Sequence, residues 1–215
     1  MPSLNRSLLF LAVLSLAFLA YSQIVTASAT SILDARVAHF FAGLWSPAGE
    51  PAGQALAVLG GVEFTALLML GLALYLWRAG FRGEVWVVLA YPAAMLIEVV
   101  YKRLVDHPEP FIAHPDGPSL SDIATGAAGI ANSYPSGHMV RTVLAYGLLA
   151  FVLNRLLPEG WARRLALPLA AVMIALMAFD RLYLGVHWQS DVIGGTLLGG
   201  AALAAAVAWL EVPHG

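Results

Sequence analysis

The stretch VIGGTLLGGAALAAAVAWL, residues 192–210, carries no charged side chain. An α-helix rises about 1.5 Å per residue, so a run of this length can cross the roughly 30 Å hydrocarbon core of a bilayer. A segment surrounded by lipid must satisfy its own backbone hydrogen bonds, which favours a helix over an open strand. We therefore predict a transmembrane helix here. Gly195 and Gly199 have the spacing that permits close contact with a neighbouring helix.

Five further segments are long and apolar enough to be read in the same way. The chain is 60% hydrophobic and 11% charged, with a mean hydropathy of +0.79, which is far more apolar than a water-soluble domain. We expect residues 1–215 to form one all-α domain, a polytopic membrane protein with six transmembrane helices. The five further segments are Leu8–Val25, Ala55–Trp77, Val85–Val105, Met139–Leu157 and Leu165–Leu182.

The arginines of the short loops predict the orientation of these helices. If the helices alternate in direction, six arginines fall on one side, which should be cytoplasmic. The segments from Thr26 to Gln54, from Asp106 to Gly137 and from Asp180 to Ser190 then face outward. We expect an integral protein of a bacterial plasma membrane, the bacterial source being inferred only from composition and compactness. The six arginines are Arg6, Arg78, Arg82, Arg155, Arg163 and Arg164.

Two segments need separate interpretation. The first apolar run, preceded by Arg6 and followed by small residues at 27–29, is also typical of a cleavable signal sequence, although we favour a retained helix. Segment 32–45 has apolar residues at helical spacing, which predicts a short helix lying in the outer membrane interface. The outer loop at 106–137 is the longest break in hydrophobicity, and long loops in compact proteins are often functional.

Charge and cysteine content exclude several classes of function. The net charge is −2 without a basic block, so nothing indicates a nucleic-acid partner. The absence of cysteine excludes disulfides, thiol nucleophiles and thiolate metal sites. Catalysis must therefore rely on other groups, among which histidines are the first candidates.

The predicted topology brings three groups of polar residues to the outer face. Lys102 ends the third span, the sequence PSGH at 135–138 begins the fourth, and Arg181, His187 and Asp191 flank the last outer turn. Taken singly, the lysine and arginine resemble snorkelling anchors, and His138 and Asp191 resemble ordinary residues at helix starts. Together they place two cations, two histidines and a carboxylate at one outer site, which favours a catalytic interpretation.

These motifs resemble those of the type 2 phosphatidate phosphatase superfamily, also called lipid phosphate phosphatases, which is related to vanadium haloperoxidases. That signature is K-x6-R-P, then P-S-G-H, then S-R-x5-H-x3-D, and the six-helix layout of its membrane members is similar too. The matching stretches here are Lys102–Pro110, Pro135–His138 and Asp180–Asp191. The resemblance implies metal-independent hydrolysis of a lipid phosphate or diphosphate.

The residue types fit phosphoryl transfer through a phosphohistidine. We expect His187 to attack phosphorus while Asp191 holds its other ring nitrogen. His138 should protonate the departing lipid oxygen and later accept a proton from water, which predicts a bell-shaped pH profile. Charge on the phosphoryl oxygens should be neutralised by Lys102, Arg181 and the backbone N–H groups of Ser136 and Gly137. We expect no metal or other cofactor.

Two positions depart from the signature. Glu109 stands where the first motif has arginine, and Asp180 stands where the third has serine. The first departure removes a phosphate-binding cation. Arg141, one turn deeper than His138, is the candidate replacement and is expected to contact phosphate or to pair with Glu109. The alternative partners for Arg141 are the other charges within the helices, Glu63 and Glu98.

Other functions stay open at this point. The same histidine also suits a lipid phosphotransferase, and Glu109 suits a catalytically impaired lipid-binding homologue, whereas a transporter would need charges nearer the midplane. The substrate class covers polyprenyl diphosphates such as undecaprenyl diphosphate, phosphatidylglycerophosphate, phosphatidate and a lipid A phosphate; polyprenyl diphosphate is our first choice. A metal cluster in the outer loop fits no ligand spacing that we would accept. Its members would be His107, Glu109, His114, Asp116 and Asp122.

Overall fold

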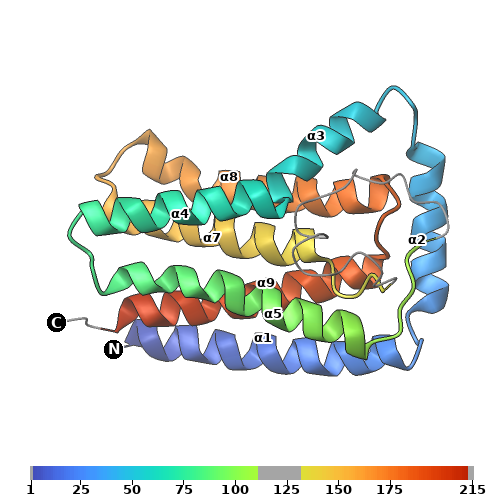
Figure 1. Ribbon diagram of the computed structural model, residues 1–215, viewed down its shortest axis with the longest axis horizontal. Helices are drawn as coiled ribbons and strands as arrows, with labels where there is room; N and C mark the ends of the chain where they lie inside the picture. The colour runs from blue at the N-terminus through green and yellow to red at the C-terminus, as the bar shows by residue number, and fades with distance from the viewer. Residues whose placement is uncertain (1, 111–131, 213–215) are drawn as a thin grey trace.

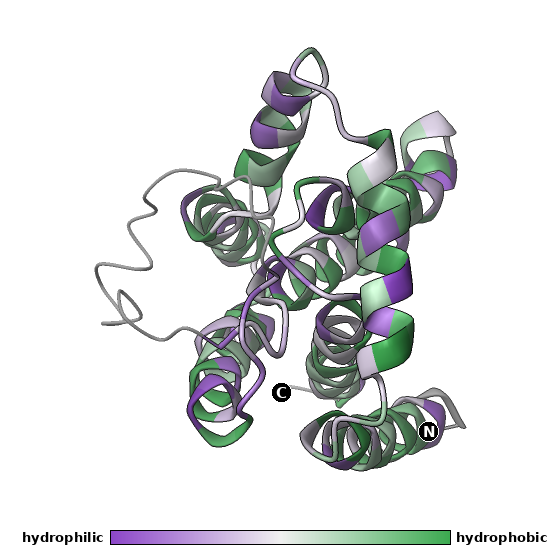
Figure 2. Ribbon diagram, turned by 90° about the vertical axis from the view of Figure 1, so that its right-hand side faces the viewer, coloured by the Kyte–Doolittle hydropathy of each residue, from purple (hydrophilic) through white to green (hydrophobic). Residues whose placement is uncertain are grey.

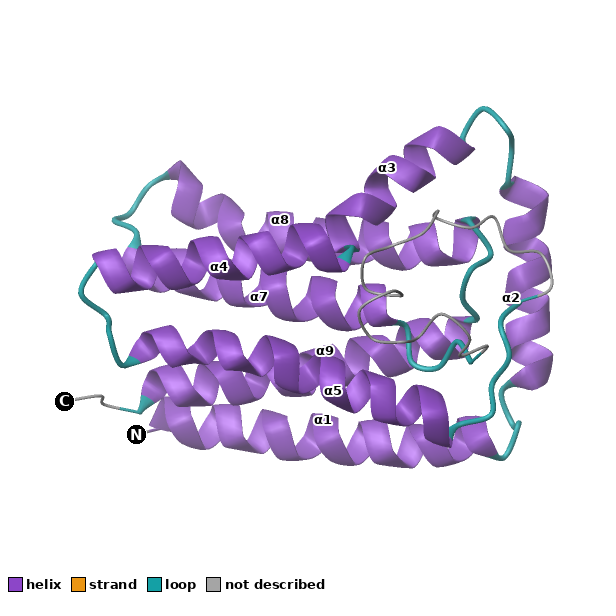
Figure 3. Ribbon diagram, in the orientation of Figure 1, coloured by secondary structure: helices purple, strands orange, loops and turns teal. Residues whose placement is uncertain are grey.

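The computed structural model describes residues 2–110 and 132–212, and this part of the chain is almost entirely helical (Figures 1 and 3). Residues 114, 116 and 122, which belong to the metal cluster considered above, lie outside it, as does most of the outer loop. The helices are α1 (Pro2–Thr26), α2 (Ser31–Leu44), α3 (Glu50–Gly60), α4 (Val62–Arg78), the 3-10 helix η1 (Glu84–Leu89), α5 (Ala90–Leu104), α7 (Gly137–Leu156), α8 (Trp161–Tyr183) and α9 (Gln189–Glu211).

Six helical spans in the described part are long and apolar enough to cross a membrane, which confirms the predicted all-α membrane fold. The second span is divided at Gly61, where extended backbone separates α3 from α4, and the third begins as η1 and continues as α5. Large apolar side chains cover the outside of the bundle, with Leu67 67% and Leu96 66% exposed. Lipid is the solvent that such a surface requires.

Helix α2 lies across one end of the bundle, where α1 ends and α9 begins (Figures 1 and 2). The structure therefore confirms a short helix at the predicted segment 32–45. Most of its residues are exposed or half-buried, and Asp34 is its single buried residue. Its position in the membrane interface stays a prediction.

Helices α7 and α9 form the buried centre of the bundle, and glycines set their separation. A Cβ atom added at Gly195 would lie 2.4 Å from the carbonyl oxygen of Ser136, and one added at Gly199 would lie 2.8 Å from that of Val140. Backbone oxygens cannot move aside as flexible side chains do. The close contact expected from the glycine spacing is therefore present, between α9 and the start of α7.

Helix α1 supports the segment that leads into α7. Tyr134 is completely buried, and its hydroxyl is 2.9 Å from the hydroxyl of Ser22 in α1. Its ring stacks on Phe18 with centroids 6.3 Å apart. Burial raises the pKa of the Tyr134 phenol, so this group acts as a neutral hydrogen-bonding side chain.

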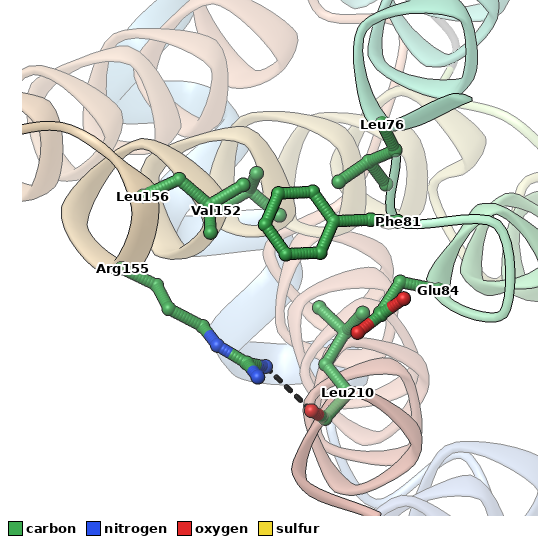
Figure 4. A pocket seen from close by; sticks show the side chains of 7 residues that line it. All are labelled: Leu76, Phe81, Glu84, Val152, Arg155, Leu156 and Leu210. Carbon is green, nitrogen blue, oxygen red and sulfur yellow. Dashed lines mark hydrogen bonds between the residues drawn. The ribbon is translucent and has the colours of Figure 1, made fainter. Parts of the chain in front are cut away.

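The opposite end of the bundle holds both termini and the connections from α4 to η1 and from α7 to α8 (Figure 1). The arginines in or beside these two connections are Arg78, Arg82, Arg155, Arg163 and Arg164. One of them, Arg155, donates a hydrogen bond to the carbonyl oxygen of Leu210 beside a small hollow that is also lined by Phe81 and Val152 (Figure 4). This contact satisfies one of the carbonyl groups that the end of a helix leaves without a partner.

The close contact of α7 with α9 leads to a first prediction. Gly195→Ala should destabilise the fold by about 1–3 kcal/mol, because the added methyl group meets backbone that cannot retreat. Thermal unfolding in detergent measures the change. Gly71→Ala in α4 is the matched control, since a Cβ atom there meets nothing within 4 Å. Equal unfolding temperatures for the two variants would contradict this account of the packing.

Candidate active site

The three predicted groups of polar residues meet at the α2 end of the bundle. Helix α5 supplies Lys102 at its last turn, α7 begins at Gly137, and the turn between α8 and α9 supplies His187. His138 is subject to electrostatic effects from Arg181, Arg141, His187 and Lys102. Residues distant in the sequence thus lie within electrostatic range of one histidine, as the predicted topology requires.

His187 and Asp191 form a hydrogen-bonded pair at the start of α9. The Nδ1 atom of His187 is 3.3 Å from Oδ2 of Asp191, whose side chain is fully buried. The same carboxylate oxygen accepts a hydrogen bond of 2.8 Å from the backbone N–H of Trp188. Because a carboxylate can only accept, Nδ1 carries the proton and the lone pair of neutral His187 lies on Nε2. This is the tautomer that a nucleophilic histidine needs.

Lys102 is held toward the segment that leads into PSGH, and not toward lipid. Its ammonium group is 3.5 Å from the carbonyl oxygen of Asn132, and the Asn132 amide donates to the backbone oxygen of Lys102 at 3.0 Å. The neighbouring Arg103 is exposed, as a snorkelling anchor would be. The two adjacent cations thus occupy different environments.

Arg181 is completely buried and forms an ion pair with Asp180, which is itself only 1% exposed. The Nε atom of Arg181 donates to Oδ2 of Asp180 at 3.2 Å, and a second guanidinium nitrogen reaches the same oxygen. Burial rules out a snorkelling role for this arginine. The carboxylate that departs from the family signature balances its charge.

Arg141 forms a buried ion pair with Glu98 of α5. One guanidinium nitrogen lies 3.3 Å from the Glu98 carboxylate, and Nε donates to the carbonyl oxygen of Gly60 at 3.2 Å. A third nitrogen lies 3.5 Å from Nδ1 of His138, which must be the acceptor because a guanidinium only donates. The partner of Arg141 is therefore Glu98, one of the alternatives to Glu109.

Gly137 makes room for this ion pair directly beside His138. A Cβ atom at that position would lie 2.0 Å from Oε1 of Glu98 and 2.7 Å from a nitrogen of Arg141. The glycine of PSGH thus admits a buried charge pair as well as leaving space at the start of α7.

The backbone of Ser136 plays a different role from the one predicted. Its N–H donates to the carbonyl oxygen of Asp191 at 3.0 Å, so it is not available as a phosphate donor. The prediction that this N–H group binds phosphate is therefore wrong, because the group forms the hydrogen bond that joins the start of α7 to α9. The Ser136 hydroxyl is buried and has no hydrogen-bond partner among the described residues. The hydroxyl, with the N–H of Gly137, is the remaining candidate donor from this segment.

Sequence reasoning missed three polar residues at this end of the bundle: Asp34, His107 and Ser190. A signal for one of them was available, because Asp34 shares a helical face with the apolar Val37 and Phe41 in the predicted segment 32–45. His107 was considered only within a metal cluster. No group of three or more His, Asp or Glu side chains in ranges 2–110 and 132–212 is arranged to hold a metal ion.

The chain belongs to the PAP2 superfamily, whose family model matches residues 83–213. It is 26% identical over 134 residues to phosphatidylglycerophosphatase B of Bacillus subtilis, a match covering 62% of this chain and 60% of that protein. It is 29% identical over 153 residues, 70% of each chain, to YbjG of Escherichia coli, which is provisionally named an undecaprenyl-diphosphatase. The crystal structure of a transmembrane PAP2 phosphatidylglycerolphosphate phosphatase from Bacillus subtilis has the same fold, with a TM-score of 0.80 over 94% of this chain and 96% of that one at 22% identity.

The Glu98–Arg141 pair leads to a prediction about stability. Arg141→Met alone should destabilise the fold by about 3–5 kcal/mol, because it leaves a buried carboxylate without a counter-charge. Adding Glu98→Met should restore most of the loss, since a buried pair can often be replaced by apolar side chains. Thermal unfolding in detergent distinguishes the variants, with Arg36→Met on the exposed side of α2 as the control. A double variant no more stable than the single one would show that the charges are not coupled.

Proposed function

We propose that this protein hydrolyses a lipid phosphate or diphosphate through a phosphohistidine intermediate at the outer membrane face. The observation that carries the proposal is the His187–Asp191 pair, which leaves the lone pair of neutral His187 on Nε2. The cationic side chains of Lys102, Arg141 and Arg181 act electrostatically on the other histidine, His138. Membership of the PAP2 superfamily supports the phosphatase chemistry. The phosphatase names of its relatives support lipid-linked substrates.

In the first step, Nε2 of His187 forms a bond to phosphorus while the bond from phosphorus to the leaving oxygen breaks. Asp191 keeps its hydrogen bond to Nδ1 and stabilises the positive charge that develops on the ring. Protonated His138 donates its proton to the leaving oxygen. The leaving group is a lipid alcohol for a monophosphate and a lipid phosphate for a diphosphate.

In the second step, water attacks phosphorus and the P–N bond breaks. His138, now neutral, accepts the proton of the attacking water, and inorganic phosphate leaves. Both steps pass through states with charge spread over the phosphoryl oxygens. We assign stabilisation of that charge to Lys102 and Arg181, with the Ser136 hydroxyl and the Gly137 N–H as neutral donors.

Arg141 has a place in this scheme despite its pairing with Glu98. Its contact with Nδ1 of His138 is long, at 3.5 Å, and opposes protonation of that nitrogen. An incoming phosphate would attract the guanidinium and favour the imidazolium form of His138. We therefore assign Arg141 to phosphate binding. Its guanidinium would leave Nδ1 of His138 and donate to a phosphoryl oxygen instead. This assignment supplies the charge that Glu109 removes.

The proposed substrates are lipids of the outer leaflet, with polyprenyl diphosphate first and phosphatidylglycerophosphate and phosphatidate as the other classes. The two named relatives act, by their names, on members of this set. A phosphotransferase would use the same residues and differ only in the acceptor that replaces water. A catalytically impaired lipid-binding homologue is the second alternative, and it rests on Glu109 alone.

Phosphate release by the purified protein tests the proposed reaction. Undecaprenyl diphosphate, phosphatidylglycerophosphate and phosphatidate should be assayed in parallel with excess chelator, because the proposed charge stabilisation comes from side chains. We expect phosphate from at least one of them. His187→Ala should reduce the rate at least about 1,000-fold, as expected for loss of a nucleophile.

Two variants extend the same assay. Arg181→Ala and the Glu98→Met/Arg141→Met double variant should both lose turnover if each arginine contacts phosphate. Normal turnover in the double variant would remove Arg141 from the phosphate site. Release of phosphate that depends on added divalent metal would contradict the metal-free mechanism, and a phosphorylated acceptor in place of free phosphate would favour the transferase.

The orientation can be measured by cysteine labelling, because the natural chain contains no cysteine. Ala48→Cys lies in the exposed turn between α2 and α3, and Glu159→Cys lies in the exposed turn before α8 at the opposite end. A membrane-impermeant maleimide added to intact cells should label the first variant and not the second. The reverse pattern would place the site on the cytoplasmic side.

A further inference from the structure

Three polar side chains outside the proposed catalytic set converge on the first turn of α9. The backbone N–H of Ser190 donates to Oδ1 of Asp34 at 2.9 Å, and the Ser190 hydroxyl donates to Oδ2 at 2.8 Å. The Nε2 atom of His107 lies 2.9 Å from the same hydroxyl oxygen. Asp34 and Ser190 are 3% and 0% exposed, so these contacts are shielded from water.

The direction of these hydrogen bonds follows from the donors available. The single hydroxyl proton of Ser190 goes to Asp34, so the hydroxyl oxygen accepts from His107 and Nε2 of that ring carries a proton. The same Nε2 lies 4.0 Å from Asp34 and 3.8 Å from Oδ1 of Asp191. That Asp191 oxygen has no hydrogen-bond partner among the described residues. One N–H group therefore lies between two buried carboxylates, one of which belongs to the catalytic pair.

His107 also connects the three motif segments. Its ring stacks on Tyr134, just before PSGH, and on Trp188, just after His187, with centroids 6.3 Å apart in both cases. Its carbonyl oxygen accepts from the backbone N–H of Ser133 at 2.8 Å. The indole N–H of Trp188 donates to the carbonyl oxygen of Pro108 at 2.7 Å. The first motif segment thus contacts Trp188, which follows His187, and Tyr134, which lies four residues before His138.

Asp34 accepts from a backbone N–H at the start of α9 that does not bond to the helix's own first-turn carboxylate. A helix start leaves backbone N–H groups without partners and favours a nearby negative charge. Asp191 accepts from the N–H of Trp188, whereas the N–H of Ser190 donates to a carboxylate of α2, more than 150 positions earlier in the chain. A helix whose single buried residue makes this contact is attached to the site through it.

We propose that Asp34 and His107 are positioning residues of the active site, which hold Ser190 and thereby fix the Asp191 carboxylate against His187. Helix α2 is then part of the catalytic framework as well as a surface element. The inference rests on the proposed function, because it assigns these residues a role in the reaction of His187. It predicts that their loss affects the transition state more than substrate binding.

Substitutions at Asp34 test this role. Asp34→Ala should lower kcat about 100-fold with KM changed less than about twofold, because misplacing a catalytic group by about 1 Å has an effect of that size. Asp34→Asn retains an acceptor for the Ser190 N–H and should lose only about 10-fold. Arg36→Ala, exposed on the same helix, is the matched control and should behave as wild type. For His107, the other proposed positioning residue, the Gln variant should retain more activity than the Ala variant. The amide of His107→Gln can still donate to the hydroxyl oxygen of Ser190, whereas His107→Ala has no donor.

A second measurement separates positioning from a general loss of structure. Orthovanadate mimics the geometry of the phosphoryl transition state, so its inhibition constant should rise in step with the fall in kcat/KM across the Asp34 variants. Folded Asp34→Ala with wild-type kcat, or a change confined to KM, would overturn the proposal. If Asp34→Ala does not fold, wild-type kcat in Asp34→Asn and His107→Ala would overturn it.

If the wild-type protein releases no phosphate from any substrate, the proposed function fails and the positioning claim is tested separately. Vanadate should then raise the unfolding temperature of the wild-type protein and Arg36→Ala, and raise that of Asp34→Ala by less. Equal vanadate-induced shifts in all three, or no shift in the wild-type protein, would count against Asp34 as a positioning residue.

Discussion

The close packing of α7 against α9 determines how the residues of the site are arranged. Gly195 allows the carbonyl of Ser136 to lie against α9, and the N–H of Ser136 then reaches the carbonyl oxygen of Asp191. This contact places the start of α7, with His138, beside the first turn of α9, which holds Asp191 and is preceded by His187. The predicted nucleophile and the predicted acid come from different motifs, and the adjacency of these two helix starts brings them to the same end of the bundle.

Buried charge is the second feature of the site. Asp180 pairs with Arg181, Glu98 pairs with Arg141, and Asp34 accepts from Ser190. Removing such groups from water is costly unless each finds a partner, and polar residues within a membrane bundle commonly mark functional sites. All three pairs lie around the two histidines. Their positions indicate that the site is held in shape by ion pairs and hydrogen bonds as much as by apolar packing.

Much of the fold was predictable from the sequence because lipid imposes a simple rule on apolar runs. The predicted helix at 192–210 is found within α9 (Gln189–Glu211), and the other five spans are also present. The break at Gly61 was not predicted, because α3 and α4 are continuous in hydropathy and the bend shows only in the backbone.

Contacts within the site were predictable where both residues belong to one short motif, as with His187 and Asp191, which are four positions apart. Contacts between helices were not predictable, because the sequence does not tell which faces of two helices turn toward each other. The partner of Arg141 therefore could not be identified from the sequence, and the structure shows that it is Glu98 of α5. For Asp34 a sequence signal was present in the helical spacing, but its partner could not be predicted, since Ser190 lies in a helix far along the chain.

The proposed mechanism requires that His187 carries the phosphoryl group, and this residue can be identified by locating a covalent phosphate. The His138→Ala variant should be mixed with p-nitrophenyl phosphate, whose leaving group needs no acid, then quenched at high pH, where a phosphohistidine survives, and analysed by mass spectrometry. The phosphohistidine mechanism predicts phosphate on the peptide that contains His187, labile in acid and absent after His187→Ala. Covalent phosphate on another residue, or hydrolysis of this ester without any phosphoenzyme, would contradict it.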